Sequence, residues 1–300
     1  MATLIPMRTG RPLEVEEYGD PRGHPAFFFH GLIGSHHQAS YIAAQAREQG
    51  LRIIAPNRPG VGRSPFVRRR TPLEVVPDVE DLAAALGLGE FSVIGISGGA
   101  PYALACLYAL GPRIRTATVI SGMGPTRLRG ALAGMDRRRR LALELGSRFP
   151  ALARRECARW AGKFRADPER FLRRLVATWP EADRALFRRE DVFALFLKDL
   201  HQVFTEGDGP RTFAQELELY RRYGFSPAAL PRRTCVMVWH GSDDTIVPPA
   251  MAWAMSGALP RCELHLVPGG HFMAIEVSDR IIRRLTQLLG NSGSAATPGG

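Results

Sequence analysis

The chain has 300 residues, of which 45% are hydrophobic and 23% are charged, an ordinary composition for a soluble globular protein with a core. No apolar run approaches the roughly 20 residues that a helix needs to cross a bilayer, which excludes a membrane span. The N-terminal stretch MATLIPMRTGRPLEVEEYGD lacks the charged and apolar regions of a signal peptide, so we expect a cytoplasmic protein.

The net charge of +11 comes from arginine, since Lys163 and Lys198 are the only lysines among 40 basic residues. The arginines are scattered through the chain and are densest between about 127 and 190. Nucleic-acid binding would require a recognisable motif beside this charge, and the sequence has none. We therefore interpret arginine runs such as 137–140 as solvated helical surface and expect no nucleic-acid partner.

The four cysteines are Cys106, Cys157, Cys235 and Cys262, and none of them forms a C-x-x-C pair. Zinc and redox motifs of that kind are therefore unsupported, and we expect no bound metal. Cys106 lies in an apolar helical stretch and Cys235 in an apolar strand, where a buried free thiol is the ordinary outcome.

Strand and helix signals alternate along the first part of the chain, which predicts a parallel sheet with helices on both faces. The predicted elements are strands at 13–18, at 26–29 and within 51–60, a helix at 79–89 that ends at Gly87 or Gly89, a strand at 91–97, a helix at about 99–110 and a strand at 115–122.

The pattern changes between about 125 and 229, where strand signals vanish. Apolar residues recur there at helical spacing, as in Leu141, Leu145 and Phe149, so we expect several helices inserted into the sheet. The alternation then resumes, with a strand at 234–241, a helix at 248–259, a strand at 262–270 and a helix at 279–290. The tail NSGSAATPGG, residues 291–300, has low complexity and is predicted to be disordered.

A single serine stands at the bend predicted between the strand VIGIS and the helix after it. Gly95, Ser97 and Gly99 match G-x-S-x-G, a turn whose strained backbone points the hydroxyl out above the sheet. The flanking glycines prevent collisions where strand and helix press together. The next amide lies at a helix N-terminus, which favours negative charge. Because Gly-rich turns also bind phosphate, the motif predicts a nucleophile only together with a base.

Candidates for a base and its orienting acid follow two later strands. Asp243 and Asp244 come after TCVMVW, and His271 follows the last predicted strand behind two glycines. The carboxyl ends of strands in such a sheet converge on one rim, so Ser97, one of the aspartates and His271 can meet there. The other histidines weighed here are interpreted as ordinary surface or core residues: His24, His36, His37, His201 and His265.

An oxyanion site also needs a donor from an earlier loop. The segment FFFHGLIGS offers the backbone amide of Leu32, after His30 and Gly31. His30 could be a second base, but a structural role in shaping the loop is the preferred interpretation.

Taken together, five motifs in this order resemble the α/β-hydrolase superfamily. They are HGLIGS at 30–35, NRPGVGRS at 57–64, GISGG at 95–99, HGSDDTIVP at 240–248 and GGHF at 269–272. The resemblance covers nearly the whole chain outside 125–229. It implies an α/β-hydrolase fold, with a mostly parallel eight-stranded sheet flanked by helices, a core formed by 1–124 and 230–290, and a helical cap at 125–229 over the active site.

Carried over position by position, the resemblance implies Ser97 as nucleophile, Asp244 as acid and His271 as base. Asp244 fits the family's Gly-x-x-Asp spacing from Gly241, whereas Asp243 is interpreted as a turn residue. The oxyanion donors would be the backbone amides of Leu32 and Gly98, and no cofactor or metal would be needed.

The sequence departs from the family at two positions and excludes two of its branches. Asn57 stands where many relatives carry aspartate, at a position that is usually structural, and Ile96 replaces the common His or Tyr before the nucleophile. Ser97 argues against the haloalkane dehalogenase and epoxide hydrolase branches, which resemble this chain but use aspartate there.

The predicted activity is hydrolysis of an ester or related acyl compound, with an apolar small molecule as substrate. Aromatic residues of the insert either line an acyl pocket or pack its helices together: Trp160, Trp179, Phe187, Phe193, Phe196 and Phe204. The resemblance also leaves open a proline iminopeptidase, a carbon–carbon hydrolase, a lyase, a cofactor-free haloperoxidase or a slow ligand-binding receptor. Acidic residues in 206–220 would suit the iminopeptidase. The sequence does not fix the substrate or the oligomeric state.

Overall fold

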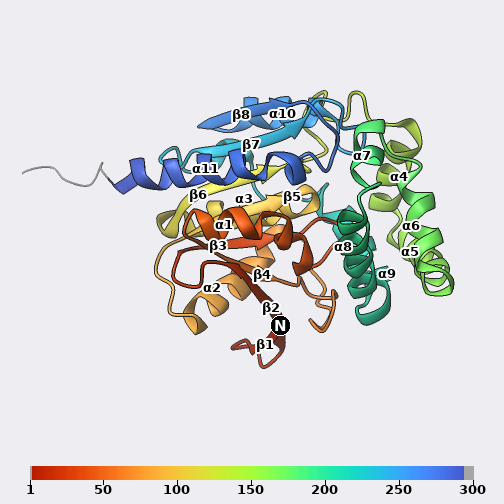
Figure 1. The fold of residues 1–300 in the computed structure, drawn as a ribbon, viewed down its shortest axis with the longest axis horizontal. Helices are drawn as coiled ribbons and strands as arrows, with labels where there is room; N and C mark the ends of the chain where they lie inside the picture. Colours follow the sequence, from red (N-terminus) through yellow and green to blue (C-terminus); the bar gives the residue numbers. More distant parts are fainter. Residues whose placement is uncertain (1, 70, 294–300) are drawn as a thin grey trace, which may run out of the picture.

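Eight strands form one sheet at the centre of the computed structural model, which describes residues 2–69 and 71–293 (Figure 1). The strands are β1 (Thr3–Pro6), β2 (Pro12–Gly19), β3 (His24–Phe29), β4 (Leu51–Pro56), β5 (Phe91–Ile96), β6 (Ile114–Ile120), β7 (Val236–Gly241) and β8 (Cys262–Val267). Their order is β1-β2-β4-β3-β5-β6-β7-β8. β2 runs antiparallel to both neighbours, and all the other pairs are parallel.

The helices fall into a set that flanks the sheet and a set inserted between β6 and β7. The flanking helices are α1 (Ala43–Glu48), α2 (Val76–Ala85), α3 (Ala100–Leu110), α10 (Pro249–Ala258) and α11 (Ala274–Gly293). The inserted helices are α4 (Arg137–Arg148), α5 (Pro150–Ala166), α6 (Pro168–Val176), α7 (Glu181–Leu186), α8 (Glu190–His201) and α9 (Gly209–Leu219). Figure 1 shows the inserted helices gathered at one end of the sheet.

Both faces of the sheet are buried because successive side chains of a strand point to opposite sides. In β3, Phe27 and Phe29 join the cluster that contains α2, α3 and α10. Ala26 and Phe28 join the cluster that contains α1 and α11. A strand buried on both faces reads as a continuous apolar run, which explains the segment AFFF.

The mostly parallel sheet, the helices on both faces and the inserted helical segment agree with the expectation from the sequence. Two short elements, β1 and α1, were not predicted. β1 is a largely exposed edge strand of four residues, and α1 has six residues and no side-chain hydrogen bond at its N-cap, so neither carries a strong local signal. The division into a core and a cap domain remains a prediction.

The C-terminal helix is longer at both ends than expected from the sequence. It begins at Ala274 rather than 279, with a kink at Val277, and it continues to Gly293. A glycine commonly ends a helix by adopting a left-handed conformation with positive φ. Gly290 does not adopt this conformation, and the helix continues past it. Residues 291–293 of the predicted disordered tail are therefore helical, while 294–300 lie outside the described residues.

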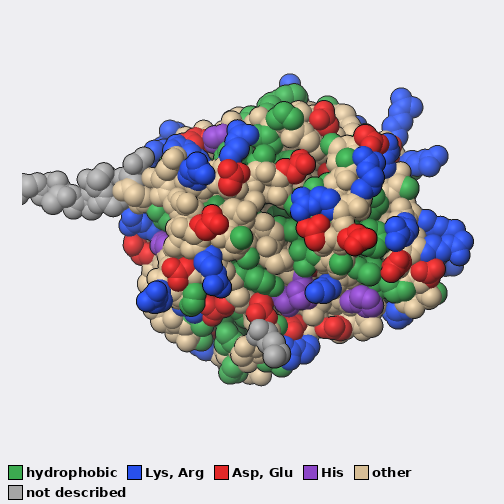
Figure 2. All heavy atoms as spheres, viewed as in Figure 1, with side chains coloured by type: hydrophobic (Ala, Val, Ile, Leu, Met, Phe, Trp, Pro, Cys, Tyr) green, Lys and Arg blue, Asp and Glu red, His purple; other side chains and the backbone are tan. Residues whose placement is uncertain are grey.

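Arginine and lysine side chains are spread over the visible face, with aspartate and glutamate among them (Figure 2). Along the inserted helices, arginines pair with carboxylates one turn away: Arg140 with Glu144, Arg159 with Glu156, Arg173 with Glu169 and Arg184 with Glu181. This pairing agrees with solvated helical surface for these arginines, whereas Arg139 of the run 137–140 is half-buried and donates to Thr178. None of the helices within the described residues is both long and apolar enough to cross a membrane.

The crossing of β5 and α3 depends on two glycines of the G-x-S-x-G turn. A Cβ on Gly95 would lie 2.7 Å from the carbonyl oxygen of Gly99, and a Cβ on Gly99 would overlap the carbonyl oxygen of Phe29. Since both obstacles are backbone atoms, they cannot move aside as a side chain can. The two positions therefore admit only glycine without a shift of the sheet.

We predict that Gly99→Ala lowers the free energy of unfolding by about 3 kcal/mol, because its methyl group would be forced against β3. The matched control is Gly257→Ala in α10, where an added Cβ meets open space. That change should raise the free energy of unfolding by about 0.5–1 kcal/mol through helix propensity. Denaturant unfolding of both variants checks this, and equal effects of the two would contradict it.

Candidate active site

Ser97 occupies a strained turn between β5 and α3. Its φ is +50°, a left-handed conformation that is uncommon for a residue other than glycine. The backbone carbonyl of Ser97 accepts a hydrogen bond of 2.9 Å from the amide of Met123, which follows β6. The strain is thus held by the surrounding structure, as expected for a side chain that must project from a fixed point.

The hydroxyl, the imidazole and one carboxylate expected from the sequence lie in a continuous hydrogen-bonded row. His271 Nε2 lies 2.9 Å from Ser97 Oγ, and His271 Nδ1 lies 2.7 Å from Asp244 Oδ2. The other carboxylate oxygen of Asp244 accepts hydrogen bonds from the amides of Ile246 and Val247. Because the carboxylate only accepts, the Nδ1 atom of the neutral imidazole carries the proton and Nε2 is free to accept from the serine.

Asp243 lies outside this row, as expected from the spacing of the motif. Its side chain is exposed, and its contacts are with the backbone of Gly269. Sequence position alone did not separate the two aspartates, and the family spacing from Gly241 selected the one that contacts His271.

The charges around His271 favour its protonated form. Burial alone would lower the pKa of His271, but the carboxylates of Asp244 and Asp183 outweigh burial and hold the pKa above its ordinary value. Burial opposes ionisation of Asp244 as well, yet contacts with His271 and His240 keep its pKa well below the ordinary range. The row therefore contains a carboxylate that is ionised at neutral pH beside an imidazole of raised basicity.

The two amides expected at the oxyanion site are neighbours. The nitrogen of Leu32 lies 2.9 Å from the point that a Cβ on Gly98 would occupy. The preceding amide, that of Gly31, is occupied because it donates to Gln38 Oε1 at 2.7 Å. The amide of Leu32 thus lies beside the turn that carries Ser97, and Gly98 is the second residue of a helical turn, where amides have no intrahelical partner.

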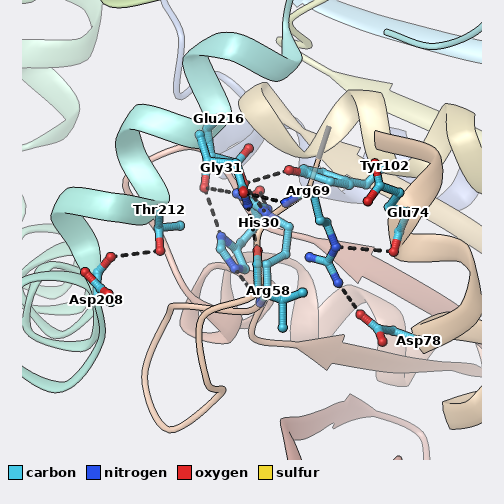
Figure 3. Close-up of polar contacts among 12 residues, drawn as sticks. His30, Gly31, Arg58, Arg69, Glu74, Asp78, Tyr102, Asp208, Thr212 and Glu216 are labelled. Atoms are coloured by element: carbon cyan, nitrogen blue, oxygen red, sulfur yellow. Dashed lines mark hydrogen bonds and ion pairs between the residues drawn. The ribbon is translucent and has the colours of Figure 1, made fainter. Parts of the chain in front are cut away.

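A buried ion pair fixes the loop that carries Leu32 (Figure 3). Arg58 Nε lies 3.2 Å from Glu216 Oε1, and the Arg58 guanidinium also donates to the carbonyl oxygens of His30 and Gly31. The hydroxyl of Tyr102, from α3, donates to the same Glu216 oxygen at 2.7 Å. A pair of fully buried charges is tolerated only where such hydrogen bonds satisfy it. The pair therefore joins the loop to α9 and to α3.

Both ring nitrogens of His30 contact backbone atoms. Nε2 accepts from the amide of Arg58, so Nδ1 carries the proton and donates to the carbonyl of Gly31. Burial, together with the charge of Arg58, holds the pKa of His30 well below its ordinary value. These contacts agree with the structural role preferred for this residue.

A protein-family model described as alpha/beta hydrolase fold matches residues 27–277. The chain belongs to the alpha/beta hydrolase fold family. No curated protein matches it.

Solved structures similar to this hydrolase-fold chain share its fold at low sequence identity. An esterase from Exiguobacterium antarcticum is 17% identical, with a TM-score of 0.68 over 97% of this chain and 100% of that one. A bromoperoxidase from Bacillus anthracis is 16% identical, with a TM-score of 0.70 over 97% and 100%. The epoxide hydrolase CorEH is 18% identical, with a TM-score of 0.72 over 97% and 99%. At these identities the likeness establishes the fold alone.

Asp183 is a residue of the site that sequence reasoning missed. It lies in α7 of the insert, and its two carboxylate oxygens accept from the amides of His271 and Phe272, each at 3.0 Å. The ring of Phe272 packs against Trp179, Phe187 and Phe196 of the insert. The inserted helices of this hydrolase fold thus hold the His271 loop through both a charge and an apolar anchor. Asp183 follows Glu181 on a short polar helix, where an acidic side chain is ordinarily a surface residue. No local feature of the sequence therefore marks it.

Ser121 and Asp199 were also missed. The hydroxyl of Ser121 donates to the carbonyl of His271 at 2.9 Å, and its φ is +45°. A signal existed here, because ISG at 120–122 repeats the ISG at 96–98 after the neighbouring strand. Asp199 of α8 accepts from the amide and the hydroxyl of Ser35, at 3.0 and 2.6 Å.

No group of three or more His, Cys, Asp or Glu residues suited to a metal ion occurs in 2–69 and 71–293. The four cysteines are free thiols.

Asp199 makes the stability of the fold depend on pH. Burial raises the pKa of Asp199 from 3.8 to about 7, and its Oδ2 atom is buried without a partner. The folded state therefore keeps this proton up to about pH 7, whereas the unfolded chain releases it near pH 4. Because the folded state binds more protons in that window, stability falls as the pH rises through it.

We predict that Asp199→Asn removes this loss, since a neutral amide oxygen can still accept from Ser35. Between pH 4 and 7 the loss in the unmodified chain is at most about 1.4 kcal/mol per pH unit. Thermal unfolding across this range checks the prediction, with Asp279→Asn on the exposed face of α11 as control. Parallel pH curves for the unmodified chain and Asp199→Asn would contradict it.

Proposed function

We propose that this chain is a serine hydrolase that cleaves an ester or a related acyl compound through a covalent acyl-enzyme. The observation that carries the proposal is the row from Ser97 through His271 to Asp244. One imidazole nitrogen contacts the hydroxyl that must lose a proton, and the other contacts the carboxylate that orients the ring. A serine hydroxyl is a weak nucleophile unless an adjacent base removes its proton, and here the base is within hydrogen-bonding distance.

In the proposed reaction, His271 Nε2 takes the hydroxyl proton as Ser97 Oγ attacks the carbonyl carbon of the substrate. The amides of Leu32 and Gly98 donate to the oxyanion of the tetrahedral intermediate. When the intermediate collapses, the bond to the leaving alkoxide breaks and His271 gives that oxygen the proton. A water molecule, deprotonated by His271, then attacks the acyl-enzyme. When this second tetrahedral intermediate collapses, the bond to Ser97 Oγ breaks, His271 returns the proton to that oxygen, and the acid leaves. Asp244 holds the imidazole tautomer and stabilises the imidazolium throughout.

An apolar acyl group suits the surroundings of the row. The side chains of Leu32, Met123 and Val247 belong to one apolar cluster. The amide of Leu32 is a proposed oxyanion donor, and the amides of Met123 and Val247 donate to Ser97 and Asp244. Several aromatic residues of the insert pack mainly on one another and on Phe272, which favours the packing role weighed for them. The inserted helices would then act as a cap, and those that share the apolar cluster with Leu32 are α4, α5 and α9.

The neighbouring acidic segment gives little support to an iminopeptidase. A free amine would need an uncommitted carboxylate, but Glu216 pairs with Arg58 and Glu218 pairs with Arg68. Asp208 caps α9 and pairs with Arg211. An esterase and an enol-lactonase occur among the similar solved structures, and both names denote hydrolysis of an acyl–oxygen bond.

We predict that Ser97→Ala reduces hydrolysis of p-nitrophenyl acetate by about 10⁴-fold or more, because it removes the nucleophile. A fluorophosphonate should label the unmodified chain at Ser97, identified by peptide mass, and should leave the variant unlabelled. The control is Ser256→Ala, whose hydroxyl donates only to the carbonyl of Trp253 in its own helix. Full hydrolysis by Ser97→Ala would refute the proposed nucleophile.

We predict that Asp183→Asn moves the acidic limb of the kcat/KM profile to lower pH, because one charge that raises the pKa of His271 is lost. The rate on the plateau should fall about tenfold, since the amide group cannot accept from both backbone amides in the same way. Asp243→Asn removes an exposed carboxylate nearby and should leave the limb in place. An unmoved limb in Asp183→Asn would show that the carboxylate has no electrostatic effect on His271.

A further inference from the structure

We propose that the hydroxyl of Tyr220 is a third hydrogen-bond donor to the oxyanion, supplied by the inserted helices. This inference rests on the proposed acyl transfer at Ser97. It begins from a mismatch in the structure: the Tyr220 side chain is 1% exposed, yet its hydroxyl has no hydrogen-bond partner. Buried polar groups without a partner are rare in folded proteins, and each of them requires an explanation.

The hydroxyl lies beside Gly98, one of the two residues whose amides form the proposed oxyanion site. It occupies the space that a side chain on Gly98 would enter, since a Cβ built on Gly98 would overlap the Tyr220 oxygen. The same point lies 2.9 Å from the nitrogen of Leu32. The Tyr220 hydroxyl, the Leu32 amide and the turn at Gly98, the residue after Ser97, therefore surround one small volume.

The ring of Tyr220 is fixed from several directions, so the hydroxyl cannot easily turn to another partner. Tyr220 is the C-cap of α9, and its carbonyl accepts from the amide of Thr126 at 3.2 Å. One turn earlier on α9, Glu216 is tied to Arg58 and Tyr102. The ring itself lies in the apolar cluster with Met123, and these contacts hold the oxygen against Gly98.

The chemistry of a phenol at this place is that of a donor. Burial and the charge of Glu216 raise the pKa of Tyr220 well above its ordinary value, so the hydroxyl keeps its proton and does not serve as a base. A buried donor without an acceptor costs about 1–3 kcal/mol. That cost is recovered when an oxygen carrying negative charge forms beside it, and a donor already fixed in place needs no reorganisation at that moment.

The arrangement also explains why position 98 is glycine. Any larger residue would displace the phenol oxygen from the space beside the Leu32 amide. The insert would thus complete the reaction centre directly, in addition to supporting the His271 loop through Asp183.

The test is Tyr220→Phe, which removes one oxygen and keeps the ring. With p-nitrophenyl acetate, kcat should fall about 10²-fold with little change in KM, because the lost contact forms only as charge develops. Affinity for phenylboronic acid, whose adduct with serine is tetrahedral, should fall by a similar factor. The melting temperature should stay the same or rise, since the variant loses an unsatisfied group.

Tyr41→Phe is the matched control, because Tyr41 also has a buried hydroxyl without a partner, and its charged neighbours are Asp191 and Asp199. It should keep the kcat of the unmodified chain. Gly98→Ala tests the placement independently: it should lower the melting temperature, and Tyr220→Phe should restore part of the loss by freeing space for the methyl group.

The outcomes separate the two proposals. If the unmodified chain hydrolyses esters and is labelled at Ser97, but Tyr220→Phe keeps full kcat and boronic acid affinity, the role of Tyr220 is refuted and the proposed function stands. Failure of the unmodified chain to be labelled or to hydrolyse any ester would instead refute the proposed function. Equal losses in Tyr41→Phe and Tyr220→Phe would also overturn the assignment of Tyr220.

Discussion

The need to satisfy buried carboxylates governs how the inserted helices sit on the sheet. Asp183, Asp199 and Glu216 come from three successive helices, and each is almost wholly removed from water. Burying a carboxyl group without hydrogen bonds is costly, and most costly when the group is ionised, so each of the three has donors outside the inserted helices. Their donors are backbone amides at 271–272, Ser35 and the guanidinium of Arg58. Every one of these partners lies in or beside a segment that the proposed reaction uses.

These buried contacts give the inserted helices a structural role at the site, in addition to the covering role proposed for them. The inserted helices contact the segment that carries His271, and so they support part of the row of side chains. The apolar contact of Phe272 with Trp179 and Phe187 adds to the same attachment. The His271 loop is therefore held by α7 of the insert as well as by the strand β8 that precedes it.

The sequence predicted the sheet and the helical insert because these depend on local patterns. The choice of Asp244 also needed the family resemblance. Ser97 and His271 stand in glycine-rich turns after apolar strands, and the spacing from Gly241 selects Asp244. Asp183 could not be found in this way, because its role depends on a hydrogen bond from a backbone amide 88 residues away in the chain. For Tyr220 the same holds, since nothing in ELELYRRYG indicates that its hydroxyl meets Gly98. Only Ser121 carried an overlooked signal, the repeated ISG after an adjacent strand.

The ion pair of Arg58 and Glu216 has a consequence for engineering this scaffold. Its two members belong to different parts of the chain, so an insert transplanted from a relative without an acidic group at this point would strand a guanidinium in an apolar interior. Chimeras that exchange the insert alone should then lose the loop at 30–32 before they lose the sheet. In this scaffold the insert and the loop that carries Arg58 should therefore be exchanged together.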